Sequence, residues 1–292
     1  MNALLATVAV LGVSLSGPLM AGTQAPALAI AFWRNALAEV VLLPVAATRH
    51  RRELRSLTRA DVRTCVLAGV ALAVHFATWV SALKLTSVAA ATALVSMQVG
   101  WVALIARLRG AQIPLGVGVG LLTAFAGVVV ITGVDLSVSR EALLGDLLAM
   151  IGGLSAAVYT VTGARARETL TTTSYTLLCY GVCAALLLVA CLVGGVSLVG
   201  FGTGAWAGIV AVTVTAQLLG HSVINHLLAV MSPMVVSLLL LLEVPGAAVL
   251  ASALLGQAPG AGVYVGLGLI LAGLAVVVMR RPPRRTEVPD SD

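Results

Sequence analysis

The chain has 292 residues, of which 60% are hydrophobic and only 10% are charged, and its mean hydropathy is +1.09. A soluble domain usually carries ~25% charged residues, so this composition excludes an ordinary water-soluble domain. We expect an all-α integral membrane protein, because the bilayer interior satisfies no exposed backbone group and the apolar runs are too long for barrel strands. The net charge of +6 does not indicate nucleic acid as a partner, since the basic residues lie in short loops between apolar runs.

Ten apolar runs predict ten transmembrane helices. In chain order they cover residues 3–22, 27–47, 64–83, 87–106, 115–134, 145–163, 173–195, 205–228, 232–254 and 261–279. The first run lacks the positive segment of a signal peptide, so we keep it as a span, and Pro18 is expected to kink it. Residues 280–292 form a polar, basic tail that we expect to be disordered.

The distribution of basic residues orients these helices. The loops 48–63, 107–109 and 164–167, together with the tail, hold fourteen arginines, whereas the opposite side has only Lys84 and Arg140. Short cytoplasmic loops are enriched in Lys and Arg. We therefore expect a multi-pass protein of the cell membrane, with both termini cytoplasmic.

The cysteines and loops give no sign of a cofactor. All four cysteines, Cys65, Cys179, Cys183 and Cys191, fall inside apolar runs, which favours neither a disulfide framework nor a metal site. No nucleotide-binding loop is present. We expect no cofactor.

The ninth run has an earlier copy in the chain. Sliding residues 232–259 back by 145 positions aligns Ser232 with Ser87, Glu243 with Gln98, Gln257 with Gln112 and Pro259 with Pro114. Polar residues and prolines are scarce here, so these coincidences predict two related halves, 1–137 and 138–279, of five helices each. Because five is odd, the second half must enter the membrane upside down, as an inverted repeat with a substrate site near the midplane.

The second run contains three polar residues, Arg34, Asn35 and Glu39. Arg34 lies near one end of the run, where it either extends to the membrane surface or faces a cavity. Asn35 and Glu39 are four residues apart and share a face. Glu39 lies deeper, and because an intramembrane carboxylate is a functional candidate by default, we predict Glu39 as a candidate coupling residue.

A polar stripe runs down the eighth span, where Thr213, Gln217, His221 and Asn225 recur every four residues. Such a stripe is costly when it faces lipid, so it faces either neighbouring helices or a wet cavity. Hydrogen bonding between helices is one interpretation. We favour the cavity, because His is an unusual residue for helix–helix contacts.

Aromatic residues accompany polar ones in three other spans. His75 and Trp79 are four residues apart, Gln98 and Trp101 are three apart, and Tyr159 lies in the sixth span. A single aromatic residue usually packs in a core. Beside His and Gln, these residues favour a mostly apolar pocket in which a few polar groups orient the substrate.

Glu243 lies near the middle of the ninth span, two residues before Pro245. An unpaired charge at that depth costs several kcal/mol, so the carboxyl group must be protonated, paired or exposed to water. Pro245 removes a backbone donor and is expected to bend the helix. A carboxylate beside such a bend suits proton coupling or binding of a substrate amine, although a structural hydrogen bond is the alternative.

These residues resemble a known family. The segment SPMVVSLLLLLEVPGAAVLASALLGQ (232–257) is similar to a pattern of the drug/metabolite transporter superfamily, in its EamA-type branch: a small residue and Pro at the start, Glu-Pro at mid-helix, and Gly-Glu at the helix end. Phe32-Trp33-Arg34 resembles the family's second helix, so Arg34 is the matching arginine. The chain departs from the pattern at Pro245, one residue later than usual, and at Gln112 and Gln257, which replace glutamates.

The resemblance covers nearly the whole chain and implies ten helices in two inverted five-helix repeats. It also implies a secondary active transporter, an exporter of small organic metabolites. The mostly apolar, aromatic pocket with few charges favours amphipathic or zwitterionic solutes such as amino acids, and Glu243 makes protons a candidate coupling ion. Two rival functions remain, an intramembrane enzyme that pairs Ser16 with His75 or His221, and a membrane scaffold without transport activity. The flank of Ser16, SLSGP, lacks a nucleophile turn, so we expect no enzyme.

Overall fold

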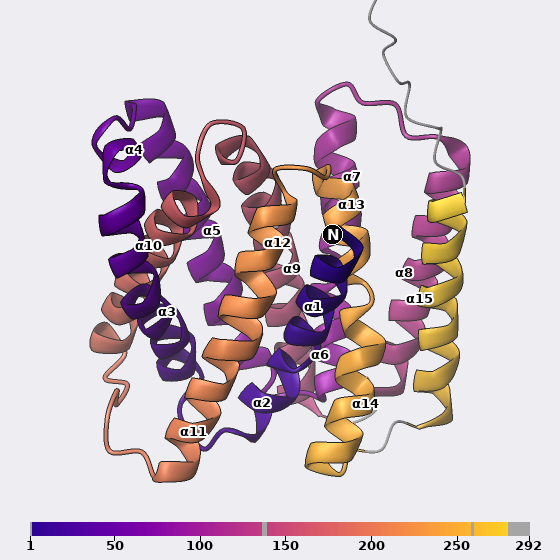
Figure 1. The fold of residues 1–292 in the computed structure, drawn as a ribbon. Helices are drawn as coiled ribbons and strands as arrows, with labels where there is room; N and C mark the ends of the chain where they lie inside the picture. The colour runs from indigo at the N-terminus through magenta and orange to yellow at the C-terminus, as the bar shows by residue number, and fades with distance from the viewer. Residues whose placement is uncertain (1, 136–138, 258–259, 280–292) are drawn as a thin grey trace, which may run out of the picture.

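The computed structural model describes residues 2–135, 139–257 and 260–279, and these fold into a bundle of helices (Figure 1). Across these described ranges no strand is present. The predicted tail, 280–292, lies outside the described residues. The all-helical prediction is therefore confirmed for the part of the chain that the structure describes.

The helices follow the predicted spans closely. In the first half they are α1 (Asn2–Ser14), α2 (Ser16–Gly22), α3 (Ala27–Arg49), α4 (Arg51–Arg55), α5 (Arg59–Ala82), α6 (Val88–Val95), α7 (Gln98–Leu108) and α8 (Leu115–Asp135). In the second half they are α9 (Arg140–Ala166), α10 (Thr172–Val193), α11 (Thr203–Val212), the π-helix η1 (Thr213–His221), α12 (Ser222–Leu227), α13 (Pro233–Leu240), α14 (Glu243–Leu255) and α15 (Ala261–Met279).

Eight helical segments of the described chain are long and apolar enough to cross a membrane. They are α1–α2, α3, α5, α6–α7, α9, α10, α11–α12 with η1, and α13–α14. The apolar stretches of α8 and α15 are shorter, Leu115–Val130 and Tyr264–Val277. A multi-pass membrane protein is thus confirmed, and the count of ten spans stays a prediction.

The predicted loop 48–63 is wrong in part, because most of it is helical. The helix α3 continues to Arg49, α4 follows, and α5 begins at Arg59. A capping box starts α5: the Asp61 backbone N–H donates to Thr58 Oγ1 over 3.1 Å, and the Thr58 N–H donates to Asp61 Oδ2 over 3.0 Å. Similarly, Ser139 Oγ accepts from the Ala142 N–H and starts α9 inside the predicted loop 135–144. Hydropathy alone misses these ends, because they are polar helical turns.

Two spans break at matching positions. The break between α6 and α7 falls at Ser96 and Met97, and the break between α13 and α14 falls at Leu241 and Leu242, one repeat offset of 145 positions later. The serines that start α6 and α13, Ser87 and Ser232, cap them in the same way, each accepting from the N–H three residues on. The two segments therefore share backbone structure as well as sequence pattern.

The packing of these broken spans fixes their relative direction. The helix α6 contacts α14, and α7 contacts α13. Each N-terminal part thus meets the C-terminal part of the other span, so the two spans run antiparallel with their breaks side by side. The other extensive pairings join α3 with α10, α5 with α9, α1 with η1, and α8 with α15, which stand together at one side of the bundle (Figure 1).

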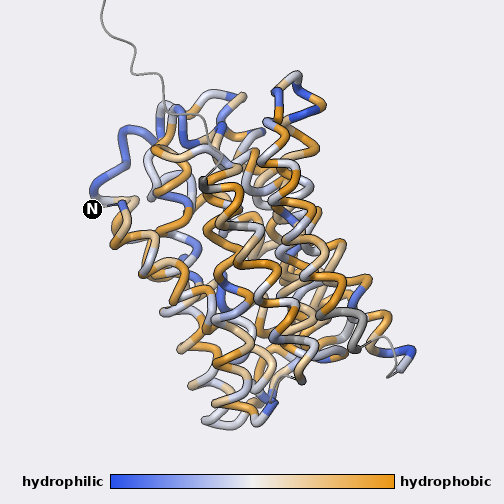
Figure 2. The backbone as a smooth tube through the Cα atoms, turned by 90° about the vertical axis from the view of Figure 1, so that its right-hand side faces the viewer, coloured by the Kyte–Doolittle hydropathy of each residue, from blue (hydrophilic) through white to orange (hydrophobic). Residues whose placement is uncertain are grey.

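Polar residues gather at the two ends of the bundle, and apolar residues cover its length (Figure 2). We call the end that carries α4 and the C-terminal ends of α7 and α9 the upper end, as in Figure 1. Ten arginines belong to the helix ends and connections there: Arg49, Arg51, Arg52, Arg55, Arg59, Arg63, Arg107, Arg109, Arg165 and Arg167.

Candidate functional site

A small cavity of about 30 Å³ lies where the two broken spans meet. Its lining comes from α5, α6, α7, α9, η1, α12, α13 and α14, and consists of His75, Trp79, Val95, Ser96, Gln98, Ala156, Tyr159, Thr160, His221, Ile224, Leu240 and Glu243. We call it the central cavity. Its volume has room for about one or two water molecules.

Gln98 and Glu243 enter the central cavity from equivalent places. Each is the first residue of the second half of a broken span, α7 and α14 respectively. Glu243 is 8% exposed, and no hydrogen bond or salt bridge is recorded for its carboxyl group within the described residues.

An aromatic group forms another wall of the cavity. The His75 and Trp79 rings stack with centroids 5.5 Å apart, and the His221 ring lies 6.5 Å from that of His75. His75 Nδ1 lies 3.0 Å from the Gly152 carbonyl oxygen, which can only accept, so Nδ1 carries a proton. The Trp79 indole N–H is buried and has no partner among the described residues. It is available to a ligand in the cavity.

Arg34 lies beside this cavity in a network of its own. Its Nε donates to Gln217 Oε1 over 2.8 Å, and its Nη1 donates to Ser16 Oγ over 3.1 Å. The guanidinium also lies 4.2 Å from the Phe76 ring centroid, a cation–π contact. Because the side chain is 0% exposed, Arg34 does not extend to the membrane surface.

The Arg34 guanidinium lacks two kinds of partner. No carboxylate of the described residues lies within 4.0 Å of it, and Glu243 is further away. Its Nη2 also has no hydrogen-bond partner among the described residues. Gln217 completes the network by donating from Nε2 to Asn35 Oδ1 over 3.0 Å. Arg34 is thus a buried positive charge whose Nη2 can still donate a hydrogen bond.

The π-helix η1 arranges the polar stripe of the eighth span. Gln217 faces Arg34, whereas His221 faces the central cavity. Asn225 lies one turn further, where its Oδ1 accepts from the Tyr159 hydroxyl over 2.6 Å and its Nδ2 lies 3.4 Å from the Tyr180 hydroxyl. In this conformation Gln217 and Asn225 join helices, and His221 lines the cavity. π-helical turns are rare and are often found at functional sites.

Six predicted site residues therefore meet at one cavity: His75, Trp79, Gln98, Tyr159, His221 and Glu243. Arg34, Gln217 and Asn225 lie in the adjoining hydrogen-bond networks. Glu39 is elsewhere, between α3 and α10, where its carboxyl group lies beside Gly181.

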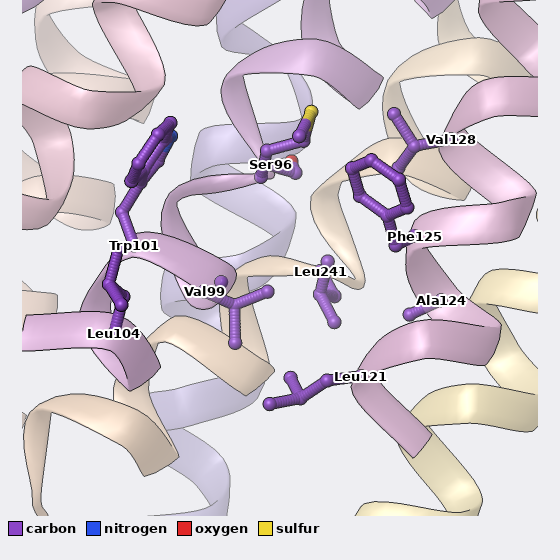
Figure 3. Close-up of a pocket in the computed structure, with 11 residues that line it drawn as sticks. Ser96, Val99, Trp101, Leu104, Leu121, Ala124, Phe125, Val128 and Leu241 are labelled. Carbon is purple, nitrogen blue, oxygen red and sulfur yellow. The ribbon is translucent and has the colours of Figure 1, made fainter. Parts of the chain in front are cut away.

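Trp101 also lies outside the central cavity. It lines a separate apolar cavity of about 210 Å³ between α7 and α8, together with residues such as Leu121, Phe125 and Leu241 (Figure 3). Gln98 and Trp101 therefore serve different cavities, although they are only three residues apart.

Sequence reasoning overlooked Tyr180 and Phe76. Tyr180 links Asn225 to Ser222, whose hydroxyl lies 3.3 Å from the Tyr180 hydroxyl. Phe76 holds the Arg34 guanidinium. The signal for Tyr180 was a hydroxyl group inside an apolar span, whereas Phe76 gives none because apolar aromatic residues are ordinary there.

The Ser–His pair of the enzymatic alternative is not formed. Ser16 Oγ accepts from Arg34, and His75 Nδ1 is directed to Gly152. Within the described residues no hydrogen bond joins Ser16 to either His75 or His221. Activation of a serine nucleophile needs such a contact.

At the upper end, α4 is docked on the start of α10. The Glu53 carboxylate accepts from the Thr171 N–H, the Thr171 hydroxyl and the Ser174 hydroxyl, each over 2.6 Å. His50 Nδ1 lies 3.5 Å from the same carboxylate. Burial acts to raise the pKa of Glu53, but these hydrogen bonds and His50 outweigh it, so the pKa lies below its ordinary value.

The EamA-like transporter family matches this chain over residues 1–133 and 143–279. Among curated proteins, none is similar enough to be a match. A solved structure described only as "Crystal structure of protein" is 20% identical, and the match covers 96% of this chain and 99% of that one with a TM-score of 0.72. At that identity the similarity shows a shared fold alone.

Proposed function

The chain belongs to the EamA-like transporter family, and we propose that it is a secondary active transporter that exports small organic metabolites, such as amino acids or other amphipathic compounds. One observation carries the proposal: a buried carboxylate, Glu243, lines a central cavity at the break of a discontinuous span. Discontinuous helices that meet at mid-membrane are the usual construction of binding sites in secondary transporters.

The proposed transport mechanism is alternating access by two inverted repeats, residues 1–137 and 138–279. The matched breaks of α6–α7 and α13–α14 support it, as does their antiparallel packing. The repeat makes α9 the counterpart of α1, α10 the counterpart of α3, and the span with η1 the counterpart of α5. The contacts follow this correspondence: α5 packs on α9 and α10, and η1 packs on α1 and α3. Two similar halves around one site can rock against each other and expose it to either side in turn.

Proton coupling at Glu243 is part of the proposal. Its carboxyl group has no salt-bridge partner within 4.0 Å among the described residues, so a proton or a substrate ammonium group is its natural counterion. His221 and His75 line the same cavity and are candidate relays. One access state would protonate Glu243, and the other would release the proton.

The lining also indicates the substrate class. Trp79, Tyr159 and the two histidines supply flat apolar faces, Glu243 supplies a site for an ammonium group, and the central cavity contains no Lys or Arg. Such a lining favours zwitterionic or amphipathic solutes over strongly anionic ones. Because the cavity has room only for water, it must widen when substrate binds.

Transport into proteoliposomes tests this function. Purified protein is reconstituted, and a panel of labelled amino acids and amphipathic amines is offered with and without a pH gradient. We expect accumulation of at least one unaltered compound that depends on the gradient. Chemical alteration of a compound would instead identify an enzyme, and neither uptake nor alteration would identify a scaffold.

A further inference from the structure

A second cavity, of about 650 Å³, opens at the upper end between α5, α7 and α9. Its lining consists of Ala60, Val62, Arg63, Thr64, Val66, Leu67, Val70, Arg109, Val161, Thr162 and Arg165. We call it the arginine cavity. Its volume falls in the ~300–1,000 Å³ range of ligand pockets.

Positive charge is concentrated at this cavity, with no acidic residue in its lining to balance it. Arg63, Arg109 and Arg165 come from three different helix ends. All three side chains are exposed, and for none of them is a hydrogen bond or salt bridge recorded with any other described residue. Three guanidinium groups around one opening form a binding site for an anion such as a phosphate.

Below the arginines the wall is apolar and faces outward. Val66, Leu67 and Val70 of α5 are 41%, 53% and 39% exposed. A helix rises 1.5 Å per residue, so Val70 lies roughly 10 Å deeper than Arg63. The site is therefore charged at the end of the bundle and apolar further into the membrane.

An adjoining cavity of about 250 Å³ extends this surface. It shares Arg109 and Val161 with the arginine cavity, and its other lining residues include Val102, Ile105 and Met234. Apolar clefts thus lie on both sides of Arg109, one along α5 and one between α7 and α13.

We propose that the arginine cavity binds an anionic phospholipid, with its phosphate between Arg63, Arg109 and Arg165 and its two acyl chains in the two apolar clefts. The arginines lie at the end of the bundle and the apolar residues lie below them, which matches a phospholipid with its phosphate at the interface and its hydrocarbon chains below. A soluble anion would contact the arginines alone, whereas a phospholipid would also cover the apolar residues below them. The proposal does not depend on what the central cavity transports.

Native mass spectrometry of the full chain in detergent tests the site. Phosphatidylglycerol is titrated against phosphatidylcholine with the same acyl chains. We expect the wild type to bind phosphatidylglycerol about tenfold more tightly, and each of Arg63→Ala, Arg109→Ala and Arg165→Ala to weaken it about fivefold. The control is Arg51→Ala/Arg52→Ala/Arg55→Ala, which removes three charges from α4 and should bind normally.

The variant that matches the α4 control in charge is Arg63→Ala/Arg109→Ala/Arg165→Ala. Equal loss of phosphatidylglycerol binding in these two triple variants would reduce the effect to net charge and overturn the proposal. The acyl chains need their own test. We expect Leu67→Ser to weaken phosphatidylglycerol binding, whereas Leu122→Ser, the same substitution at an exposed position of α8, should not. If Leu67→Ser binds normally, or glycerol 3-phosphate displaces the lipid at equal concentration, the site is one for soluble anions.

Discussion

At the scale of single residues, the central cavity places one carboxylate opposite neutral groups. Glu243 and its repeat counterpart Gln98 both line it, so the two halves resemble each other in shape and differ in charge at one position. Arg34 carries a buried positive charge, but its guanidinium contacts Gln217, Ser16 and Phe76 and forms no ion pair with Glu243. The unbalanced charge at Glu243 is what a coupled transporter would use.

Glu243→Gln tests this directly. The change keeps the shape and hydrogen-bonding capacity of the side chain and removes its exchangeable charge. We expect normal insertion in the membrane and a loss of gradient-driven accumulation of roughly tenfold or more, with exchange partly retained. Transport is measured in proteoliposomes with and without a pH gradient.

Glu39→Gln is the matched control, because it alters a carboxyl group that lies outside the central cavity. It should keep most of the accumulation. A Glu243→Gln protein that transports at the wild-type rate with the same pH dependence would make Glu243 a structural hydrogen-bonding residue.

His221→Ala should lower transport about fivefold, because it removes a polar wall of the cavity. The control is Leu219→Ala two positions away, where the side chain is 47% exposed and does not line the cavity. A change of that kind is expected to stay within about twofold of the wild type. Equal transport by both variants, at equal expression, would limit the stripe to helix contacts.

The sequence predicted which polar residues face the interior of the bundle better than it predicted what each of them contacts. Spacing of four residues placed His75 with Trp79, and Gln217 with His221, on shared faces. Yet Gln217 contacts Arg34 while His221 lines the cavity, because the π-helix turns them toward different neighbours. Such a local change in helical period depends on tertiary packing and leaves no mark in hydropathy.

At the scale of helices, the breaks are the informative elements. Proline predicted the break before Pro245, since its missing N–H leaves a carbonyl without a partner. The α6–α7 break has no proline, with Gly100 at the equivalent position, and only the repeat alignment predicts it. Gln257 has a role in this region too: its Oε1 accepts from the Val88 N–H at the start of α6. Gln112 cannot make the equivalent hydrogen bond, because the residue that corresponds to Val88 is Pro233, which has no backbone N–H.

The docking of α4 on α10 should depend on pH. Because hydrogen bonds hold the pKa of Glu53 below its ordinary value of about 4.3, this carboxylate stabilises the docked state fully above that pH. The contribution is lost as the pH falls through the lower folded-state pKa. We expect hydrogen exchange in residues 51–56, after correction for the intrinsic rate, to accelerate below pH ~4.

Glu53→Gln should produce the faster exchange already at neutral pH, by roughly tenfold, since charge-assisted hydrogen bonds are lost. Glu141→Gln, in the exposed first turn of α9, is the control and should leave residues 51–56 unchanged. Exchange that is independent of pH and of residue 53 would mean that other contacts hold α4.

At the scale of the molecule, the arginines predict which end faces the cytoplasm. In a variant whose four native cysteines are changed to alanine, we expect Arg55→Cys to react with an impermeant maleimide only from the cytoplasmic side. Arg140→Cys should react only from outside, since it lies at the other end of the bundle. Labelling of Arg55→Cys from outside intact cells would reverse the topology.

The overall architecture was the easiest part to predict, because lipid leaves few choices for an apolar chain. Nearly every span boundary agrees with the helices to within a few residues, and the exceptions are the first turns of α5 and α9, residues 59–63 and 140–144, which carry charged side chains. The cavities were beyond prediction, since they depend on how side chains of eight segments fill the interior. The arginine cavity in particular joins residues 63, 109 and 165, which share no pattern in the sequence.

The pairing of α8 with α15 has a consequence for how the chain is made. Their backbones approach so closely that a Cβ on Gly127 would overlap the Gly266 carbonyl, and one on Gly273 would overlap the Gly120 carbonyl. A ribosome adds ~5–20 residues per second, so after Asp135 is made the last residue of α15 follows roughly 7–30 s later. If α8 is one of the ten predicted spans, it waits in the membrane during that interval without the helix that it packs against most closely. A chain that ends before α15 would therefore leave the small-residue face of α8, including Gly120 and Gly127, without the backbone that it packs against.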